Sequence, residues 1–404
     1  MDFFDKMLDD NRINGFLEYR SNRKIPDFRV ESMQEYLSSP RYREDVLRIK
    51  NGDYYFSIPE KKLIPKSYTD RKRTVYHFEE DEMTLLRVMS YILHDYEYIF
   101  VKELYSFKKG ISAKNFLRFY QRNPSLHNMY VAKTDIKSYG NSIDADILIQ
   151  KLEAALGNEE PELLSFFIWL LNRKQFTLNG QLTTGDTSAL AGIPIHNFFT
   201  NLYLSDTDHI LTDRCAAYAR YSDDILMITP TYDEAKENMD FLMKEFERLH
   251  LTPHGGDKTT ILRPGETFEY LGISMTGNQA DIAPSSIKKL KRKMRIRAKR
   301  IQRDKKGRYN SPEEKAKHLL LLNHRTFYGK PGSRDLSWSQ WAFPVITRTD
   351  SLKALDLYNQ RCLRYVLTGK WSDAQYRVKY EELKKLGYKS LVREYYSSEG
   401  ADVY

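Results

Sequence analysis

The chain has 404 residues, of which 64 are Lys or Arg and 55 are Asp or Glu, giving a formal net charge of +9. Its 41% apolar content is enough for a large core and excludes a disordered or collagen-like protein. Two cysteines, Cys215 and Cys362, are too few for a disulfide scaffold or a four-cysteine zinc site. The longest nearly apolar run, residues 163–171, is too short to span a bilayer. We therefore expect a cytoplasmic protein without a membrane span.

Helices flank a basic, strand-like region in the first third of the chain. Residues 1–59 read as helix and loop and form an N-terminal extension. The strand-like region that follows contains Lys61, Lys62, Arg71, Lys72 and Arg73 and leads into TVYHF, whose β-branched and aromatic residues favour a strand. Residues 82–96 have helical periodicity, and LYSFKKGIS at 104–112 is predicted to be a strand or loop with a turn at Gly110.

The central part of the chain alternates strands and helices. YVAKTDI at 130–136 predicts a buried strand that ends in an acid, with helices following over 142–156 and 195–211. AYARYSDDILMIT at 217–229 predicts a hairpin, because two strand-like arms meet at Ser-Asp-Asp, residues that favour turns. Apolar residues then recur at helical spacing over 235–249.

Short strands, KTTIL and FEYLGISM, follow that helix, and after Pro284 the chain becomes helical and basic. The order strand, helix, helix, hairpin, helix, strand fits an antiparallel sheet backed by helices, an α+β fold. We expect three domains: the extension at 1–59, a central domain at 60–283 and a basic helical region at 284–404.

The positive charge is concentrated in one segment. Residues 287–308 contain thirteen Lys or Arg and one acid, a net charge of +12, which leaves −3 for the rest of the chain. An apolar stripe at helical spacing would face a core, so the other faces would present cations. Their mutual repulsion favours a polyanionic partner, nucleic acid rather than a membrane surface, because the stripe is narrow and lacks Trp and Phe. The cations expected to bind it are Lys289, Arg292, Arg295 and Arg300.

Acids end two of the predicted strands. Asp135 ends the strand at 130–136, and Asp223 and Asp224 form the tip of the predicted hairpin. If these strands are neighbours, three carboxylates meet and repel one another unless a cation is present. Carboxylate oxygens suit Mg²⁺, which also binds substrate phosphates. Two such ions can activate a 3′-hydroxyl and stabilise a departing pyrophosphate.

The order of these motifs resembles that of the reverse transcriptase family, and specifically its bacterial branch. YVAKTDIKSYGNSI at 130–143 is similar to the first catalytic motif, and YARYSDDILMI at 218–228 is similar to the Tyr-x-Asp-Asp hairpin. HGGDKTTIL at 254–262 looks like the motif with a lysine near the triphosphate. RKRTVYHF at 71–78 resembles the segment of the fingers whose arginine meets the triphosphate, and FEYLGISM at 268–275 resembles the primer grip.

The resemblance covers about residues 60–283 and implies a right-hand polymerase with fingers, an antiparallel-sheet palm and a helical thumb. It implies that two Mg²⁺ ions assist nucleotidyl transfer from dNTPs, copying an RNA template into cDNA. The implied catalytic acids are Asp135, Asp223 and Asp224. The implied metal-binding residues are these three acids and Ile136, and the implied nucleotide-binding residues are Arg73, Tyr139, Gly140, Gly192 and Lys258. Arg73 would offer a planar fork to phosphate oxygens, and Lys258 would stabilise the leaving pyrophosphate or give it a proton.

The chain departs from the family pattern at two places. Gly140 stands where the family has a Tyr or Phe under the incoming sugar, so either Tyr139 serves instead or ribonucleotides are weakly excluded. LAGIPIHNFFTN at 190–201 aligns with the family's Pro-Gln-Gly motif: Gly192 and Asn201 match, but the glutamine is absent and His196 replaces a serine. We expect His196 to pack or hydrogen-bond structurally rather than to catalyse.

The AGIPI variant at 191–195 and the C-terminal part at 351–396 resemble reverse transcriptases associated with phage defence and abortive infection. The expected function is therefore an antiviral polymerase that copies a dedicated noncoding RNA, with a separate effector protein as a further partner. The alternatives are a retron-type enzyme, untemplated or protein-templated synthesis, and a non-catalytic RNA-binding scaffold. Protein-primed synthesis is also open, with C-terminal tyrosines as candidate primers, although packing and base stacking are favoured for Tyr395, Tyr396 and Tyr404.

Overall fold

The computed structural model of the chain divides into two units, each with its own core. The first contains Met1–Phe116 and Asn128–Pro264, and the second contains Leu117–His127 and Gly265–Tyr404. The residues described are 1–21, 27–53, 56–65, 72–304, 307–329, 337–372 and 376–399. Arg71 and Tyr404, both singled out by sequence, lie outside these ranges.

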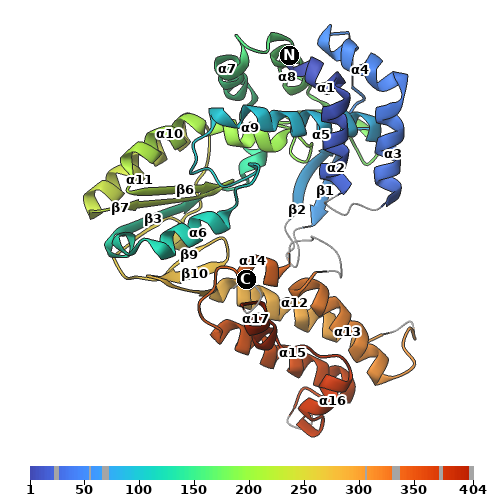
Figure 1. Cartoon of the computed structure of the whole chain (residues 1–404), viewed down its shortest axis with the longest axis vertical. Coiled ribbons are helices and arrows are strands. Elements are labelled where there is room, and N and C mark those ends of the chain that lie inside the picture. Colours follow the sequence, from blue (N-terminus) through green and yellow to red (C-terminus); the bar gives the residue numbers. More distant parts are fainter. Residues whose placement is uncertain are drawn as a thin grey trace. The chain divides into compact units, whose positions relative to one another are not determined.

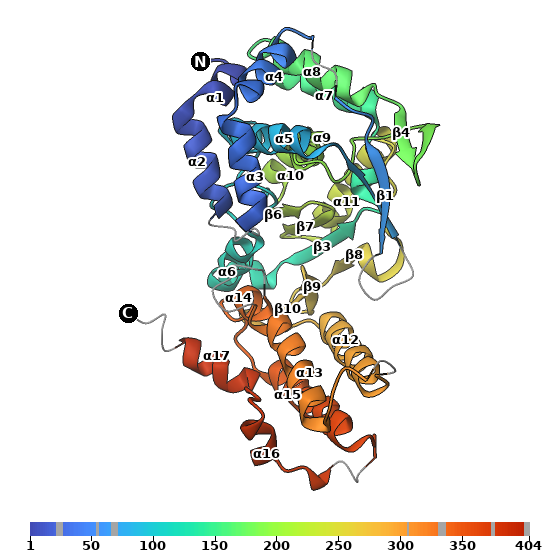
Figure 2. The same cartoon turned by 90° about the vertical axis from the view of Figure 1, so that its right-hand side faces the viewer.

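Helices form one end of the first unit. The N-terminal helices are α1 (Phe3–Leu8), α2 (Asp10–Ser21), α3 (Asp27–Ser38) and α4 (Pro40–Lys50); they gather around α5 (Glu80–Ile92) (Figures 1 and 2). Phe3 and Phe4 are buried, and the Phe3 N–H donates to Glu160 Oε2 at 2.9 Å, just before α8 (Pro161–Leu171). The helices predicted for 1–59 are therefore present, and they belong to the core of the unit.

A four-stranded sheet lies beside these helices in the order β2-β1-β4-β5. It consists of β2 (Lys72–His77), β1 (Glu60–Pro65), β4 (Gln175–Leu178) and β5 (Gln181–Thr184). The strands β1 and β2 fall in the region predicted to be strand-like, whereas β4 and β5 were not predicted. Asn179 and Gly180, which join β4 to β5, both have positive φ, as a two-residue hairpin turn requires. Their Asn-Gly dipeptide is the sequence signal for this hairpin.

A second four-stranded sheet has the order β6-β7-β3-β8, and all its pairs are antiparallel. Its strands are β3 (Tyr130–Asp135), β6 (Ala217–Tyr221), β7 (Asp224–Thr229) and β8 (Thr260–Leu262). The helix α11 (Tyr232–Arg248) packs against β3 and β7 through Ala235, Met239, Leu242 and Phe246 (Figure 1). Helix α7 (Ala145–Leu156) and the strands at 130–136, 217–229 and 260–262 confirm the elements predicted here.

The single helix predicted over 195–211 is wrong. The structure has two helices, α9 (His196–Tyr203) and α10 (Ser205–Arg214), separated by Leu204, whose φ of −109° and ψ of 8° are not helical. The Ser205 hydroxyl donates to the Leu202 carbonyl at 2.8 Å, and such local bonds compete with helix continuation. The break lets each helix bury its own face.

The second unit joins a three-stranded sheet to a group of helices. The sheet runs β11-β10-β9, with β9 (Phe268–Tyr270), β10 (Ile273–Thr276) and β11 (Gln279–Ile282). The helices are α12 (Pro284–Gln302), α13 (Pro312–Phe327), α14 (Trp338–Ala342), α15 (Asp350–Thr368), α16 (Tyr380–Lys385) and α17 (Leu391–Glu399). Among these, α12, α13 and α15 lie side by side (Figures 1 and 2).

The boundary between the units therefore lies before β9, and the expected boundary at 283/284 lies within the second unit. The reason is that β11 leads directly into α12, and the Thr347 and Arg348 N–H groups donate to the Ala280 carbonyl at 2.8 and 3.1 Å. The division into fingers, palm and thumb stays a prediction. Helices and largely antiparallel sheets confirm the α+β fold class. Within the described residues, no helix is long and apolar enough to cross a membrane.

Candidate active site

The sheet β6-β7-β3-β8 brings the predicted acids to one edge. Asp135 at the end of β3 pairs directly with Asp224 at the start of β7. Asp223 belongs to the turn between β6 and β7, and its carbonyl accepts a hydrogen bond from the Ile136 N–H at 3.2 Å. The preceding residue, Ser222, has a φ of +58°, which closes the tight turn. The three acids, far apart in sequence, thus share one strand edge.

A buried arginine fixes this turn. Arg220 at the end of β6 is fully buried and pairs with Asp208 of α10, which is 1% exposed; its Nε and Nη2 donate to the two carboxylate oxygens at 2.7 and 2.5 Å. Its remaining guanidinium bonds go to the Ser222 carbonyl at 3.2 Å and the Asn201 carbonyl at 3.0 Å. Tyr218 also donates to Asp208, at 2.7 Å. The bidentate pair therefore joins the turn to α9 and α10.

Ser106 and Asn201 hold the turn from the other side. The Ser222 N–H donates to the Ser106 hydroxyl at 3.1 Å, and that hydroxyl lies 3.1 Å from Asn201 Oδ1. The Asn201 amide returns a bond to the Ser106 carbonyl at 3.0 Å. Both side chains are buried, so water does not compete for these bonds. Asn201 matches the family pattern in sequence, and the structure gives it this bracing position.

The electrostatics of the edge reflect crowded carboxylates. Burial, with added repulsion from Asp223 and Asp135, raises the pKa of Asp224 to about 7 from its ordinary value of 3.8. Lys258 and Lys133 oppose this rise. Asp135 makes an ion pair with Lys258. The raised pKa means that Asp224 keeps its proton to a higher pH than an ordinary carboxyl group does.

The loop that carries Lys258 is tied to the strand that carries Asp135. The His254 N–H donates to the Asp135 carbonyl at 2.7 Å, and the Lys137 N–H donates to the Thr252 carbonyl at 2.8 Å. The His254 Nε2 lies 3.9 Å from Asp135 Oδ1, so this imidazole is a further charged neighbour when protonated. Behind them, the Thr134 and Thr259 hydroxyls lie 2.8 Å apart.

The donor set fits a hard divalent cation, although the side chains are not assembled around one. In the part of the chain that the structure describes, no three His, Cys, Asp or Glu side chains lie close enough to hold a metal ion. The Asp135 carboxylate instead contacts the Lys258 ammonium. Burial and the other two acids both raise the pKa of Asp224, and a cation bound at this edge would relieve the repulsion among the three carboxylates.

Arg73 and Gly192 lie on the β2-β1-β4-β5 side of the unit. Arg73 is exposed on β2, opposite Ile64 of β1. Gly192 has a φ of +103°, and a Cβ there would lie 2.7 Å from Val75 Cβ, so only glycine fits this close approach. The Tyr76 N–H donates to the Ala191 carbonyl at 2.7 Å. These contacts tie the loop around 190–193 to β2.

The Tyr139 ring lies in the core of the first unit. Its side chain is buried, and its hydroxyl donates to the Thr200 carbonyl at 2.6 Å. The short helical turn Tyr139–Asn141 directs the ring inward, and the nucleotide-binding role of Tyr139 stays a prediction. A Cβ built on Gly140 would instead lie 2.5 Å from Nε2 of His196. The His196 Nδ1 lies 2.8 Å from the Ala189 carbonyl, which holds the imidazole in this position.

The two departures from the family pattern are thus complementary in space. The histidine fills the volume that a larger residue at 140 would need, and burial lowers the pKa of His196, which keeps it neutral. In this tautomer Nδ1 donates to Ala189 and Nε2 is an acceptor facing Gly140.

The predicted nucleic-acid-binding residues lie on the surface of α12. Leu290, Met294, Ala298 and Ile301 form its buried stripe, as expected, while Ser286 is buried in place of Ile287. Arg297 is committed to structure, since its Nη1 donates to the Leu322 carbonyl at 2.7 Å. The four predicted cations are all exposed: Lys289, Arg292, Arg295 and Arg300.

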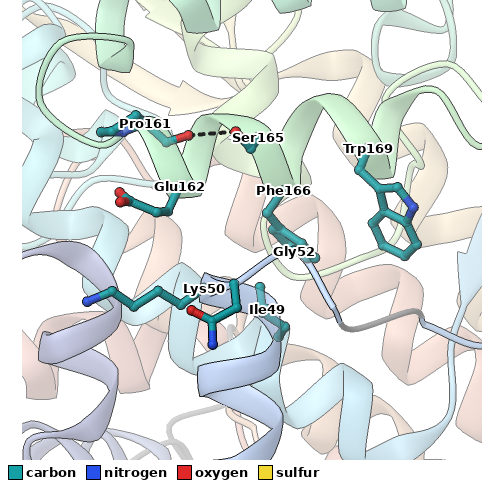
Figure 3. Close-up of a pocket in the computed structure, with 9 residues that line it drawn as sticks. Ile49, Lys50, Gly52, Pro161, Glu162, Ser165, Phe166 and Trp169 are labelled. Atoms are coloured by element: carbon teal, nitrogen blue, oxygen red, sulfur yellow. Dashed lines mark hydrogen bonds between the residues drawn. The ribbon is translucent and has the colours of Figure 1, made fainter.

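A pocket of about 490 Å³ lies elsewhere in the first unit, between the end of α4 and α8 (Figure 3). Phe166 and Trp169 project from α8, and Lys50 comes from α4. The Lys50 ammonium is already paired with Asp2 Oδ2 at 2.7 Å. None of the predicted site residues lines this pocket.

Sequence reasoning missed Arg220, Asp208 and His254. Arg220 carried a signal: it is the charged residue inside an otherwise apolar and aromatic strand arm, AYARY. Asp208 had none, because it is one acid among several in SDTDHILTDR. His254 stands at the head of HGGDKTTIL, where only Lys258 was singled out.

No protein-family model matches the sequence, and no curated protein does. Among solved structures, the apo telomerase of Candida tropicalis truncated from its C-terminal domain is 12% identical, with a TM-score of 0.43 over 56% of this chain and 55% of that one. The telomerase of Candida albicans with a fragment of telomeric RNA is 14% identical, with a TM-score of 0.42 over 86% and 64%. Another apo telomerase of Candida tropicalis is 10% identical, with a TM-score of 0.49 over 83% and 60%. The chain therefore spans between 55% and 64% of the length of these telomerase chains.

Proposed function

We propose that this protein is an RNA-directed DNA polymerase that transfers nucleotides to a 3′-hydroxyl at the edge formed by β3 and β7. The observation that carries the proposal is the direct pairing of Asp135 with Asp224, with Asp223 in the adjoining turn. The order of the sequence motifs supports it, because the segments at 130–136 and 217–229 that resemble the two acid-bearing motifs form neighbouring strands of one sheet.

Asp135, Asp223 and Asp224 would hold two Mg²⁺ ions, together with the main chain at Ile136. The ions would supply activation of the 3′-hydroxyl and charge neutralisation at the phosphates. Lys258 pairs with Asp135 in the protein alone, and its exposed ammonium can turn to the pyrophosphate to stabilise it or give it a proton. Arg73 is exposed and can reach phosphate oxygens with its planar fork.

Sugar selection falls to His196 in this proposal. The resemblance puts residue 140 beside the incoming sugar, and His196 covers Gly140. A neutral imidazole of fixed orientation would border the 2′ position, in place of an aromatic ring. His196→Ala should therefore raise the ratio of ribonucleotide to deoxynucleotide incorporation, measured with each purified triphosphate on one primed template.

The biological role proposed is antiviral: the enzyme copies a dedicated noncoding RNA into cDNA, and a separate effector protein acts with it. The A-G-I-P-I segment and the C-terminal part support this through their resemblance to phage-defence enzymes. Protein-primed synthesis would need an accessible hydroxyl. Tyr395 is buried and donates to the Ile346 carbonyl at 2.8 Å, whereas Tyr396 is 59% exposed.

The experiment compares the wild type with Asp223→Ala/Asp224→Ala, purified from its own cells with and without phage infection. All bound RNA and newly made DNA are sequenced. A control variant, Asp213→Ala/Asp240→Ala, removes two exposed acids of α10 and α11. One enriched RNA with complementary DNA, present in the wild type and control but absent from the Asp223/Asp224 variant, supports the proposal.

Other outcomes contradict it in distinct ways. DNA without complementary RNA would point to untemplated or protein-templated synthesis, and a DNA copy of a structured RNA covalently joined to that RNA would point to a retron-type enzyme. RNA without DNA in every sample would point to a non-catalytic scaffold, in which case phage protection would survive the loss of both acids. Addition of Mg²⁺ should also raise the melting temperature of the wild type and not of the Asp223/Asp224 variant.

A further inference from the structure

Basic and aromatic side chains surround the ring of Trp371, just after the end of α15. Gly369, with a φ of +71°, ends this helix in a left-handed turn, and its N–H donates to the Tyr365 carbonyl at 2.9 Å. The turn brings Trp371 back onto the helix, where its ring lies 5.0 Å from that of Tyr365 and 6.2 Å from that of Tyr358, both edge-on. The Arg361 Cζ lies 5.1 Å from the Trp371 centroid.

Helix α12 contributes cations to the same cluster. The Arg295 Cζ lies 5.9 Å from the Trp371 centroid, and the Lys291 Nζ lies 5.7 Å from the Tyr358 centroid. Lys291 and Arg295 are four residues apart and share a helix face, as Tyr358, Arg361 and Tyr365 do on α15. Because α12 and α15 lie side by side (Figure 2), the cluster spans both helices.

Three cations in this cluster have no carboxylate partner among the described residues: Lys291, Arg295 and Arg361. Arg295 and Arg361 are exposed, while Trp371 is half-buried. The ring attracts both guanidinium groups through its π face and so limits the conformations they sample. Like charges held this close repel one another, and an external polyanion would offset that repulsion.

We propose that Trp371 is the platform of a phosphate-binding site, at which Arg361 and Arg295 contact neighbouring phosphates of a nucleic-acid strand. Arg361 is a ligand from α15, outside the basic segment that the sequence identified. The site extends the nucleic-acid surface of α12 onto a second helix, and Trp371 aligns the two guanidinium forks with phosphate oxygens. It rests on the proposed binding of nucleic acid and requires no catalysis.

The test is the affinity for a short, fluorescently labelled RNA of mixed sequence, measured over a range of NaCl concentrations, in EDTA and without nucleotides. Arg361→Gln should lower the slope of log K against log salt by about 0.7 for the lost phosphate contact. Trp371→Leu keeps every charge, so it should weaken binding about two- to fivefold with an unchanged slope. Arg393→Gln, the same change at an exposed arginine of α17, is the matched control and should bind like the wild type.

Wild-type affinity and slope in Arg361→Gln would overturn the site. Because Arg361 is exposed, its replacement should not disturb folding. Thermal melting checks separately that Trp371→Leu is folded. Arg361→Gln could lose affinity while folded Trp371→Leu binds like the wild type. That result would contradict the role of Trp371 in aligning the arginines. Equal, Arg361-dependent binding to anionic lipid vesicles would overturn the assignment to nucleic acid. The measurement involves no nucleotide and no metal, so a failure of the polymerase proposal leaves this test intact.

Discussion

The acidic edge of the first unit and the basic helix α12 of the second are both concentrations of charge in the sequence. They differ in burial and in hydrogen bonding. At the acidic edge the charged and polar groups are braced: Arg220 is fully buried, and Asp208, Asn201 and Ser106 bond to it or to the turn. On α12 the four predicted cations are exposed, whereas Arg297 donates to the Leu322 carbonyl and the Thr326 hydroxyl of α13 at 2.7 and 2.8 Å.

The difference fits the roles proposed for the two regions. The proposed chemistry would need the acids on a rigid support, and the buried bonds to Arg220 and Ser222 hold the turn in place. Attraction of a polyanion needs charge density, and flexible exposed side chains supply it without fixed geometry. The cluster at Trp371 lies between these extremes, because one ring orders two exposed cations.

The largest expected effect is the loss of the buried brace. Arg220→Met should lower the free energy of unfolding by about 3–5 kcal/mol, because it leaves the Asp208 carboxylate buried without its partner. Arg220→Met/Asp208→Leu should lower the free energy of unfolding by less than the single change does, because no buried charge is then left without a partner. Urea denaturation measures both. Arg248→Met, at an exposed pair with Glu245, is the control and should cost less than about 1 kcal/mol. Equal costs for Arg220→Met and Arg248→Met would remove the contrast between the two regions.

The raised pKa of Asp224 predicts a pH-dependent stability. The folded protein holds the proton more tightly than the unfolded chain, so the stability present at low pH is lost as pH rises from about 4 through about 7. Asp224→Asn should therefore raise the free energy of unfolding above about pH 7, by at most about 4 kcal/mol, without metal. At about pH 5 the gain should be roughly a third of that. The exposed Asp213→Asn is the control. A gain independent of pH would contradict the pKa of Asp224 that burial and the neighbouring acids raise.

Charge reversal on α12 should alter binding and leave folding nearly unchanged. Changing Lys289, Arg292, Arg295 and Arg300 to Glu should weaken RNA binding by about two orders of magnitude and lower the salt slope by about 3. The melting temperature should change little, because all four side chains are exposed. Lys236→Glu/Lys244→Glu on α11 is the control for charge alone. Wild-type affinity and slope in the fourfold variant would sink the assignment of α12 to nucleic acid.

The smallest expected effect concerns the packing of His196 against Gly140, close to the acids in sequence and in the fold. Gly140→Ala should lower the free energy of unfolding by about 1–3 kcal/mol, because the new methyl group would overlap the His196 ring. Adding His196→Ala should recover much of that cost. Gly255→Ala, where a Cβ meets nothing within 4 Å and the backbone is extended, should cost much less. The three variants are compared by thermal melting. Equal decreases in melting temperature for Gly140→Ala and Gly255→Ala would show that the His196 ring moves aside without loss of stability.

Much of the central sheet could be predicted because its signals are local. The apolar run before Asp135 and the Ser-Asp-Asp between two strand arms fix a strand and a hairpin within a few residues. The hairpin β4–β5 was missed although its Asn-Gly turn is an equally local signal. The break at Leu204 was missed because the apolar pattern runs through it, while the competing Ser205 bond is visible only in the folded chain.

By itself the sequence determined the α+β class, the acids at the strand ends and the basic face of α12, since each depends on residues near one another in the chain. Only the tertiary structure decided which residues brace and fill the site. It brought His196 against Gly140, joined Arg220 to Asp208, turned Tyr139 into the core and set Arg361 beside Arg295 on Trp371. Such pairs depend on the packing of distant segments, and the spacing of residues along a chain carries no record of which side chains that packing brings together.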